Sequence, residues 1–160
     1  MLIDDGLELL TEAECRQLVA TADVGRIGVT VGGLPAIFPV NYRMIDGGIV
    51  FRTAPGSKLA AATREAVVAF EVDNYDALHR SGWSVLVVGK AHVVHDLDLT
   101  FKALAANLEP WAAAESRTSL VRVDIEFLSG RRIVTDSGAP RPSRSAKNRN
   151  GATTAQGEPS

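Results

Sequence analysis

Apolar and polar residues alternate along several stretches of the chain, the pattern of a β-strand with one buried face. In residues 26–31, "RIGVTV", the alternation places Ile27, Val29 and Val31 on one side of the strand. Residues 119–134 repeat the pattern, with an apolar side made of Val121, Val123, Ile125 and Phe127. This period predicts a protein built mainly from strands.

Turn residues separate the predicted strands at short intervals. The glycine-rich turns "GGL" and "DGG" join three strands in consecutive hairpins, at residues 26–31, 35–45 and 49–53. Further strands are predicted at residues 66–73, 84–95 and 119–134, and residues 74–83 are predicted to be a polar loop. Two irregularities are expected within strands: Pro39 implies an edge or a bulge, and Gly89 implies a bulge or a bend.

Three segments have the pattern of helices. Thr11 and Glu14 form a T-x-x-E capping box, and the helix that follows has an apolar face of Cys15, Leu18, Val19 and Ala22. Cys15 is therefore interpreted as a small core residue rather than a nucleophile. A short helix is predicted in "KLAAAT" and an amphipathic one at residues 97–108. The apolar face of the latter is predicted to consist of Leu97, Phe101, Leu104 and Leu108.

The order of these elements indicates the fold class. Strands joined by tight turns pair antiparallel, and about six of them suffice to close a small barrel. A doubly wound nucleotide-binding sheet is excluded, because it needs a helix between successive strands. The prediction is a mainly β protein, a six-stranded antiparallel barrel with two or three peripheral helices.

Composition narrows the class of protein further. With 46% hydrophobic and 22% charged residues and a net charge of -2, the chain gives no reason to expect nucleic acid or an anionic membrane as a partner. The single cysteine excludes an internal disulfide and a cysteine-built metal site. No apolar run reaches the length of a membrane span, and the first residues are acidic, so we expect a cytoplasmic protein.

The chain divides into two parts of different composition. Residues 1–136 carry the strand and helix patterns and are predicted to form one domain. Residues 137–160 contain no Val, Ile, Leu, Phe, Met, Trp or Tyr, and they carry four basic residues against one acidic residue. Because such a segment buries too little apolar surface to offset its chain entropy, we predict a disordered basic tail.

The segment "RTAPGSKL" gathers groups that suit a phosphate. Arg52 and Lys58 supply cations, Thr53 and Ser57 supply hydroxyls, and the amides of a helix start follow directly. The spacing is not that of a Walker loop. From the residues alone, a phosphate site and a simple capped turn with solvated charges are both open.

Two further segments suggest contacts with a planar ligand. In "FPVNY", Asn41 and Tyr42 follow a strand irregularity and offer polar groups, although an irregular edge strand explains them equally well. In "HRSGWS", Trp83 suits stacking on an aromatic ligand, a subunit contact, or a half-buried place in the core. No residue is singled out as a catalytic acid or base. His92 and His95 are predicted to point to opposite faces, and no metal site is expected.

These segments, in this order, resemble the pyridoxamine 5'-phosphate oxidase-like family of FMN-binding split barrels. The hallmarks are "PVNY", then "FRT..GSKL", then "SGWSVLVVGKA", and the likeness covers roughly residues 8–134. More narrowly, the chain is similar to the short bacterial branch that includes the nitroimidazole-resistance proteins. The basic substrate-gripping motif of the vitamin-processing oxidases is not matched, because "SGRRIV" leads into the tail.

The resemblance implies a homodimer of six-stranded split barrels with a flavin in each of two clefts between the subunits. The residues implied to contact FMN are Pro39, Val40, Asn41, Tyr42, Arg52, Thr53, Ser57, Lys58, Trp83, Ser84 and, from the partner chain, Trp111. The implied function is an oxidoreductase that passes electrons from a nicotinamide cofactor to a small, planar, electron-poor acceptor.

Two alternatives stay open at this point. Relatives with this fold also bind a deazaflavin, whose longer anionic tail would need further cations such as Arg64. A non-enzymatic carrier or sensor of flavin or haem is the other alternative, with His79 as the candidate axial ligand of a haem.

Overall fold

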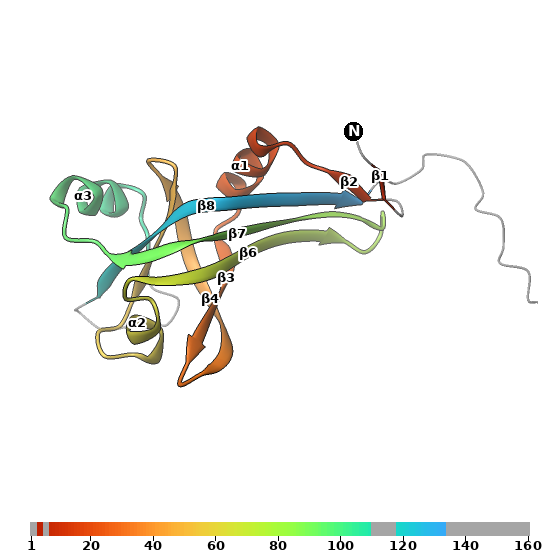
Figure 1. Ribbon diagram of the computed structural model, residues 1–160. Coiled ribbons are helices and arrows are strands. Elements are labelled where there is room, and N and C mark those ends of the chain that lie inside the picture. The colour runs from red at the N-terminus through yellow and green to blue at the C-terminus, as the bar shows by residue number, and fades with distance from the viewer. Residues whose placement is uncertain (1–2, 5–6, 110–117, 134–160) are drawn as a thin grey trace, which may run out of the picture.

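The computed structural model of the chain describes residues 3–4, 7–109 and 118–133. Along these residues the strands are Ile3–Asp4 (β1), Leu7–Leu9 (β2), Val24–Val31 (β3), Leu34–Ile45 (β4), Gly48–Thr53 (β5), Ala66–Asp76 (β6), Ser81–Val93 (β7) and Ser119–Ile133 (β8). The helices are Glu12–Thr21 (α1), Lys58–Ala62 (α2) and Leu97–Ala105 (α3), as labelled in Figure 1.

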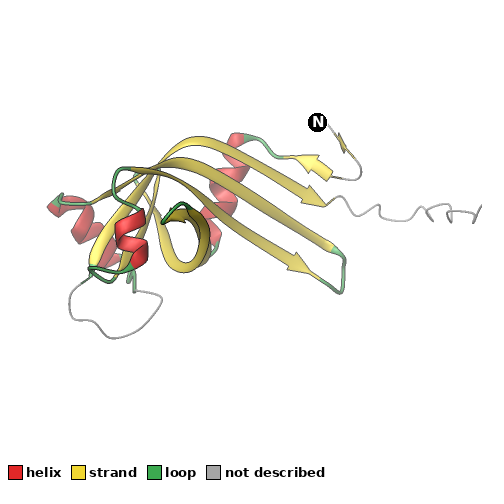
Figure 2. Cartoon of the chain, turned by 60° about the horizontal axis from the view of Figure 1, so that its bottom comes forward, coloured by secondary structure: helices red, strands yellow, loops and turns green. Residues whose placement is uncertain are grey.

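Six of these strands close a ring in the order β8, β5, β4, β3, β6 and β7, because β7 pairs with β8 as well as with β6. All the pairings in the ring are antiparallel. The short strands β1 and β2 extend the sheet at the far end of β8 (Figure 1). The described part of the chain confirms the predicted six-stranded, mainly β barrel with helices at its periphery (Figure 2).

Alternate side chains of the ring fill its interior, as the period of two predicts. Tyr42, Phe51 and Phe70 are the largest fully buried side chains. The rings of Tyr42 and Phe70 meet edge to face with centroids 4.8 Å apart, a geometry that adds about 0.5–1.5 kcal/mol beyond area burial. The Tyr42 hydroxyl donates a hydrogen bond to the carbonyl of Val19 in α1. Burial raises the pKa of Tyr42, so its hydroxyl stays neutral inside the barrel.

A bulge interrupts the β7–β8 ladder at Gly89. Gly89 pairs with Ile125 while the residue before it pairs with Phe127, so Glu126 is an extra residue in β8. A Cβ atom at Gly89 would collide with the backbone carbonyl of Asp124, which explains the glycine. The predicted irregularity is confirmed, but the extra residue also reverses the alternation of β8. The predicted place of Phe127 on the inner face is therefore wrong, and its side chain is 52% exposed.

Helix α1 follows the sequence prediction closely. The Thr11 amide donates to the Glu14 carboxylate at 2.8 Å, and the Glu14 amide donates to the Thr11 hydroxyl at 3.3 Å. Cys15 and Val19 are buried in the main core cluster. The capping box and the apolar face are both confirmed.

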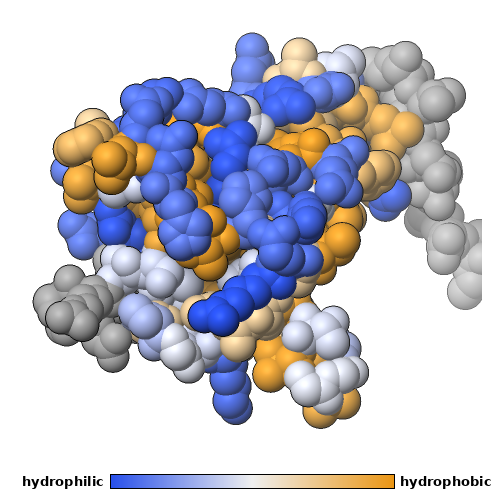
Figure 3. Space-filling model, turned by 60° about the vertical axis from the view of Figure 1, so that its left-hand side comes forward, coloured by the Kyte–Doolittle hydropathy of each residue, from blue (hydrophilic) through white to orange (hydrophobic). Residues whose placement is uncertain are grey.

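Helix α3 presents a different face to the protein from the one predicted. Leu99 and Ala103 are buried and join a second core cluster outside the ring, formed with Ile45, Val50, Leu108 and Leu120. Leu97, Phe101 and Leu104 are exposed instead, so the predicted face is wrong except for Leu108. Figure 3, turned so that the α3 end comes forward, shows apolar surface interleaved with hydrophilic side chains.

The polar loop predicted at residues 74–83 is mostly strand. β6 continues to Asp76 and β7 begins at Ser81, with Asn74 paired to Trp83 and Tyr75 paired to Gly82. Only residues 77–80 connect the strands. Residues 73–80 are exposed and show no apolar alternation, whereas Trp83 at the base of the hairpin packs against the main core.

The predicted tail at residues 137–160 lies outside the described residues. In the part of the chain that the structure describes, none of the helices is long and apolar enough to cross a membrane.

Candidate functional site

The barrel is split between β4 and β5. Tyr42 and Phe51 form the last pair of the β4–β5 ladder. Beyond that pair, β4 pairs only with β3, over Leu34–Asn41, and β5 pairs only with β8. One edge of β4 therefore has no strand beside it among the described residues. Pro39 lies in this half of the strand, as expected for a residue that cannot donate to a ladder.

The segment after β5 is a capped turn. The buried Thr53 hydroxyl lies 2.9 Å from the Ser57 hydroxyl, and the Ser57 oxygen accepts a hydrogen bond from the Ala60 amide at 3.0 Å. Gly56 has a φ of 76°, the left-handed region that glycine adopts without strain. The turn brings Thr53, Ser57 and the start of α2 together, and α2 packs against β3. The turn and the open edge of β4 thus flank the place where β4 and β5 separate (Figure 1).

Lys58 and Arg52 differ in how many hydrogen bonds their charged groups make within the described part of the chain. Arg52 donates through Nε to the Leu108 carbonyl at 2.8 Å and through a terminal nitrogen to the Thr118 hydroxyl at 2.9 Å. These bonds tie its guanidinium to the segments around α3 and β8. Lys58 is exposed, and no hydrogen bond or ion pair with any described residue engages its ammonium group. Among the described residues at the split, Lys58 is thus a cation that remains available to an anion.

The four β4 residues that were expected at a ligand fall on two faces. Val40 and Tyr42 are buried in the core, so only their backbone groups could meet a molecule outside the barrel. Pro39 and Asn41 occupy the alternate, outward positions. The Tyr42 hydroxyl bonds to the Val19 carbonyl inside the barrel, so this side chain is not turned toward a molecule outside the barrel.

Trp83 and Ser84 do not lie at the split. They line a separate hollow of about 410 Å³, together with Tyr75 and Arg131 from the neighbouring strands. The Trp83 side chain also packs against the main core. Trp111 lies outside the described residues. Within one chain, the structure thus brings Thr53, Ser57 and Lys58 together at the start of α2, and Trp83 and Ser84 line a different hollow.

Sequence reasoning gave Tyr75 no role and did not connect Arg131 with Trp83 and Ser84. Extending the predicted fourth strand through Asp76 would have placed Tyr75 on the outward face beside the fifth strand. The signal was weak, because the stretch is polar on both faces.

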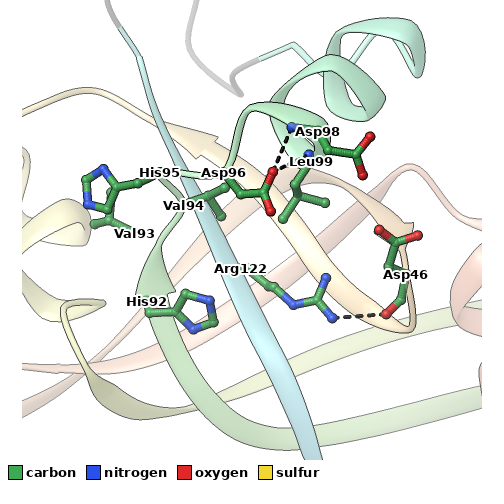
Figure 4. A pocket seen from close by; sticks show the side chains of 9 residues that line it. All are labelled: Asp46, His92, Val93, Val94, His95, Asp96, Asp98, Leu99 and Arg122. Atoms are coloured by element: carbon green, nitrogen blue, oxygen red, sulfur yellow. Dashed lines mark hydrogen bonds between the residues drawn. The ribbon is translucent and has the colours of Figure 1, made fainter.

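A second hollow of about 310 Å³ lies at the opposite end of the β7–β8 ladder (Figure 4). Arg122 crosses it and donates to the Asp124 carboxylate at 2.7 Å and to the carbonyls of Ile45 and Asp46 at 3.0 Å each. His92 and His95 both line the hollow, and their rings point apart in Figure 4.

The described histidines and carboxylates do not form a metal centre. Among these residues, no group of three or more His, Cys, Asp or Glu side chains is arranged to hold a metal ion. His79, in the turn after β6, is exposed and its Nδ1 lies 2.6 Å from the Asp76 carboxylate. That contact lowers the pKa of Asp76.

Comparison with known proteins gives consistent matches over most of the barrel. Residues 11–132 match the model of the pyridoxamine 5'-phosphate oxidase family. An uncharacterized protein of Mycobacterium tuberculosis is 38% identical over an alignment of 136 residues, with coverage of 82% of this chain and 88% of that protein.

Solved structures share the fold. The FAD binding protein of Mycobacterium smegmatis is 38% identical, with a TM-score of 0.71 over 80% of this chain and 99% of the other. A candidate 5-nitroimidazole antibiotic resistance protein of Bacteroides thetaiotaomicron is 15% identical, with a TM-score of 0.62 over 80% and 89% of the two chains. At that identity, the second likeness concerns the fold alone.

Proposed function

Because the chain belongs to the pyridoxamine 5'-phosphate oxidase family, we propose that it binds a flavin nucleotide at the split between β4 and β5 and acts as an oxidoreductase. The observation that carries this proposal is the exposed ammonium of Lys58 beside the capped turn of Ser57, which no residue in the described part of the chain engages. A similar FAD binding protein of known structure supports a flavin as the ligand class.

The residues at the split fit the phosphate end of such a cofactor. Lys58 supplies a point charge, and Ser57 and Thr53 supply hydroxyls that are already held 2.9 Å apart. Arg52 contributes less than its charge suggests, since two acceptors within the chain already engage its guanidinium. The outward residues Pro39 and Asn41, and the backbone of the open β4 edge, are proposed to border the flavin ring.

A bound flavin would supply the capacity to accept and release hydride or single electrons. The chain's own part is to hold the phosphate, to orient the ring against β4 and to limit its exposure to water. We propose that a nicotinamide cofactor is the reductant and that a small, planar, electron-poor molecule is the acceptor. No described side chain at the split is assigned as an acid or base.

We also propose that the protein is a homodimer, with the split at the interface. Five residues that are cross-strand partners of one another form a row on the outer face of the barrel, one from each of β4, β3, β6, β7 and β8. They are Ile37, Gly28, Ala69, Val88 and Phe127. Ile37 is 72% exposed and Phe127 is 52% exposed, so the described residues leave both ends of this apolar row uncovered, one of them next to Pro39. A second copy is proposed to cover it.

The cofactor proposal is tested by the substitution Lys58→Ala. Losing one charge-assisted bond to a phosphate should weaken binding of FMN and FAD by about 1–3 kcal/mol, measured by quenching of flavin fluorescence. Arg64→Ala is the matched control, because Arg64 is also an exposed cation, just beyond α2. Equal affinity in Lys58→Ala and the unmodified protein would remove Lys58 from the phosphate site.

The same titration discriminates among the alternative cofactors. Binding of a deazaflavin, with a loss of affinity in Arg64→Ala, would favour the longer anionic tail over FMN or FAD. A Soret band in the purified protein would move the assignment to haem and to His79. If none of these cofactors changes the spectrum, the cofactor proposal fails.

The dimer proposal is tested by sedimentation velocity. The unmodified chain should sediment as a dimer, and Ile37→Glu should shift it toward the monomer, because a charge would be buried in an apolar interface. If the split lies at that interface, flavin affinity should fall together with dimerisation. A monomer that binds flavin with full affinity would contradict the placement of the site.

A further inference from the structure

A carboxylate lies on the outer surface that a second copy of the chain is proposed to cover. We propose that Glu71 takes up a proton when two copies associate, so that the dimer becomes tighter as the pH falls. The inference rests on the homodimer proposed above and adds a regulation of its interface, and thereby of the flavin site placed there. The proton comes from water and binds a carboxylate oxygen of Glu71, and no other covalent bond is made or broken.

Glu71 lies in the row of outward residues next to the apolar row. It follows Ala69 by two residues on β6, and its cross-strand partners are Arg26 on β3 and Leu86 on β7. Arg26 is paired in turn with Pro39 on the open half of β4. Two residues along a strand span about 7 Å, and a stable interface takes about 800 Å² from each partner. A contact centred on the apolar row therefore covers Glu71 as well.

Glu71 and a second carboxylate share one cation. Nη1 of Arg26 lies 2.9 Å from Oδ1 of Asp73 and 3.4 Å from Oε2 of Glu71, so Asp73 is the closer partner. The cluster thus carries one positive and two negative charges. The cross-strand neighbours of the two acidic residues on β7, Leu86 and Ser84, carry no charge. Among the described residues, the charge of Glu71 is therefore only partly compensated.

Burial acts on Glu71 in the single chain and acts more strongly in a dimer. The Glu71 side chain is 35% exposed, and its withdrawal from water, with the nearby charge of Asp73, raises its pKa above the usual 4.5 despite the opposing charge of Arg26. A second copy would exclude more water and raise this pKa further. A carboxyl group whose pKa is higher in the dimer binds a proton on association. The dimer should therefore tighten as the pH falls through the pKa of Glu71 in the dimer, and the effect should level off below its pKa in the free chain.

An ion pair between subunits is the competing way to neutralise Glu71. On the outward face, Lys90 is already engaged by Glu65 at 2.7 Å. Arg131 has no ion pair with a described residue, but it lies on β8 one row further from the apolar row than Glu71 does. The position of Glu71 beside apolar residues therefore favours the proton, and the two arrangements predict opposite effects of removing its charge.

Sedimentation velocity of the full chain over a range of concentrations tests the proposal, from about pH 7.5 to about pH 5. The dissociation constant of the unmodified dimer should fall by about tenfold or more over this range, since one pKa unit at one group is a factor of ten and the dimer contains two copies of Glu71. Glu71→Gln should form the tighter dimer at neutral pH and lose most of the pH dependence, because an amide keeps the shape of the side chain without a charge to bury. Glu12→Gln is the matched control, since Glu12 also pairs with an arginine, at 2.9 Å, but lies on α1. The dimer of this control should keep the pH dependence.

Two results would overturn the proposal while leaving the dimer in place. One is a dissociation constant that stays the same across the pH range. The other is a weaker dimer in Glu71→Gln than in the unmodified chain at neutral pH, which would mean that the charge is needed, as in an ion pair with Arg131 of the partner subunit. A chain that stays monomeric at every pH would instead contradict the proposed homodimer, and this inference with it. If the unmodified dimer remains intact at the lowest concentration measured, the series is repeated with Ile37→Ala added to each variant, which weakens the interface without adding a charge.

Discussion

The two ends of the β7–β8 ladder carry similar residues but use them differently. At one end, His92 pairs with Arg122; at the other, Ser84 pairs with Arg131. Each arginine comes from β8 and lines a hollow. Arg122 has three acceptors within the chain, whereas Arg131 has none among the described residues.

An arginine beside a hollow therefore indicates a ligand site only when its N–H donors are not already bonded within the chain. Arg122 connects the β4–β5 turn to β8, through the carbonyls of Ile45 and Asp46. Gly48 makes room for it, since a Cβ there would lie 2.6 Å from Cζ of Arg122. Arg122 therefore stabilises the fold, and Arg131 is available to a ligand.

Among the substitutions that test this comparison, Arg122→Gln is expected to lower the free energy of unfolding most. The Arg122 side chain is only 17% exposed, and its loss leaves two backbone carbonyls and the Asp124 carboxylate without their donor. The free energy of unfolding should fall by about 2 kcal/mol, the scale of hydrogen bonds that involve a charged group. Urea denaturation followed by circular dichroism measures this change.

Arg131→Gln serves as the opposite case in the same experiment. Because no described residue depends on its guanidinium, the free energy of unfolding should stay within about 0.5 kcal/mol of the unmodified value. A loss as large as that in Arg122→Gln would show that Arg131 has a structural role, and the comparison between the two ends would fail.

The strands and the first helix could be predicted because their signals are local. The period of two depends on which side chains face the interior, and the capping box depends on residues three apart. The bulge at Gly89 was also predicted from the sequence. Its effect on Phe127 was not, because the position of the extra residue, Glu126, depends on pairing with another strand.

The parts of the site that could not be predicted depend on distant segments. Arg52 and Lys58 are equivalent as cations in the sequence, but Arg52 meets the Leu108 carbonyl, which is 56 residues away and is placed by the docking of α3. The buried face of α3 itself was mispredicted, because Leu99 and Ala103 pack in one cluster with Val50, which lies 49 residues before Leu99 in the chain. Sequence periodicity does not record such contacts.

The smallest effect on stability is expected from the capping box of α1, whose Glu14 lies near Arg132 at the same end of the β7–β8 ladder as Arg131. The Thr11 amide and hydroxyl bond to the Glu14 carboxylate, and Arg132 lies nearby, which lowers the pKa of Glu14 below its usual 4.5. A carboxyl group whose pKa is lowered by folding contributes stability that is fully present above its unfolded pKa and is lost as the pH falls through its folded pKa.

Glu14→Gln tests this contribution, because glutamine keeps the hydrogen-bonding pattern of the box without a titrating charge. The variant should be slightly less stable than the unmodified chain at neutral pH. The difference should shrink as the pH falls below about 4.5, since the glutamate is then becoming neutral as well. Urea denaturation at a series of pH values between neutrality and the acid transition measures both curves. A difference that stays constant over this range would mean that the Glu14 charge does not stabilise the folded chain, and that acid weakens this end through other groups.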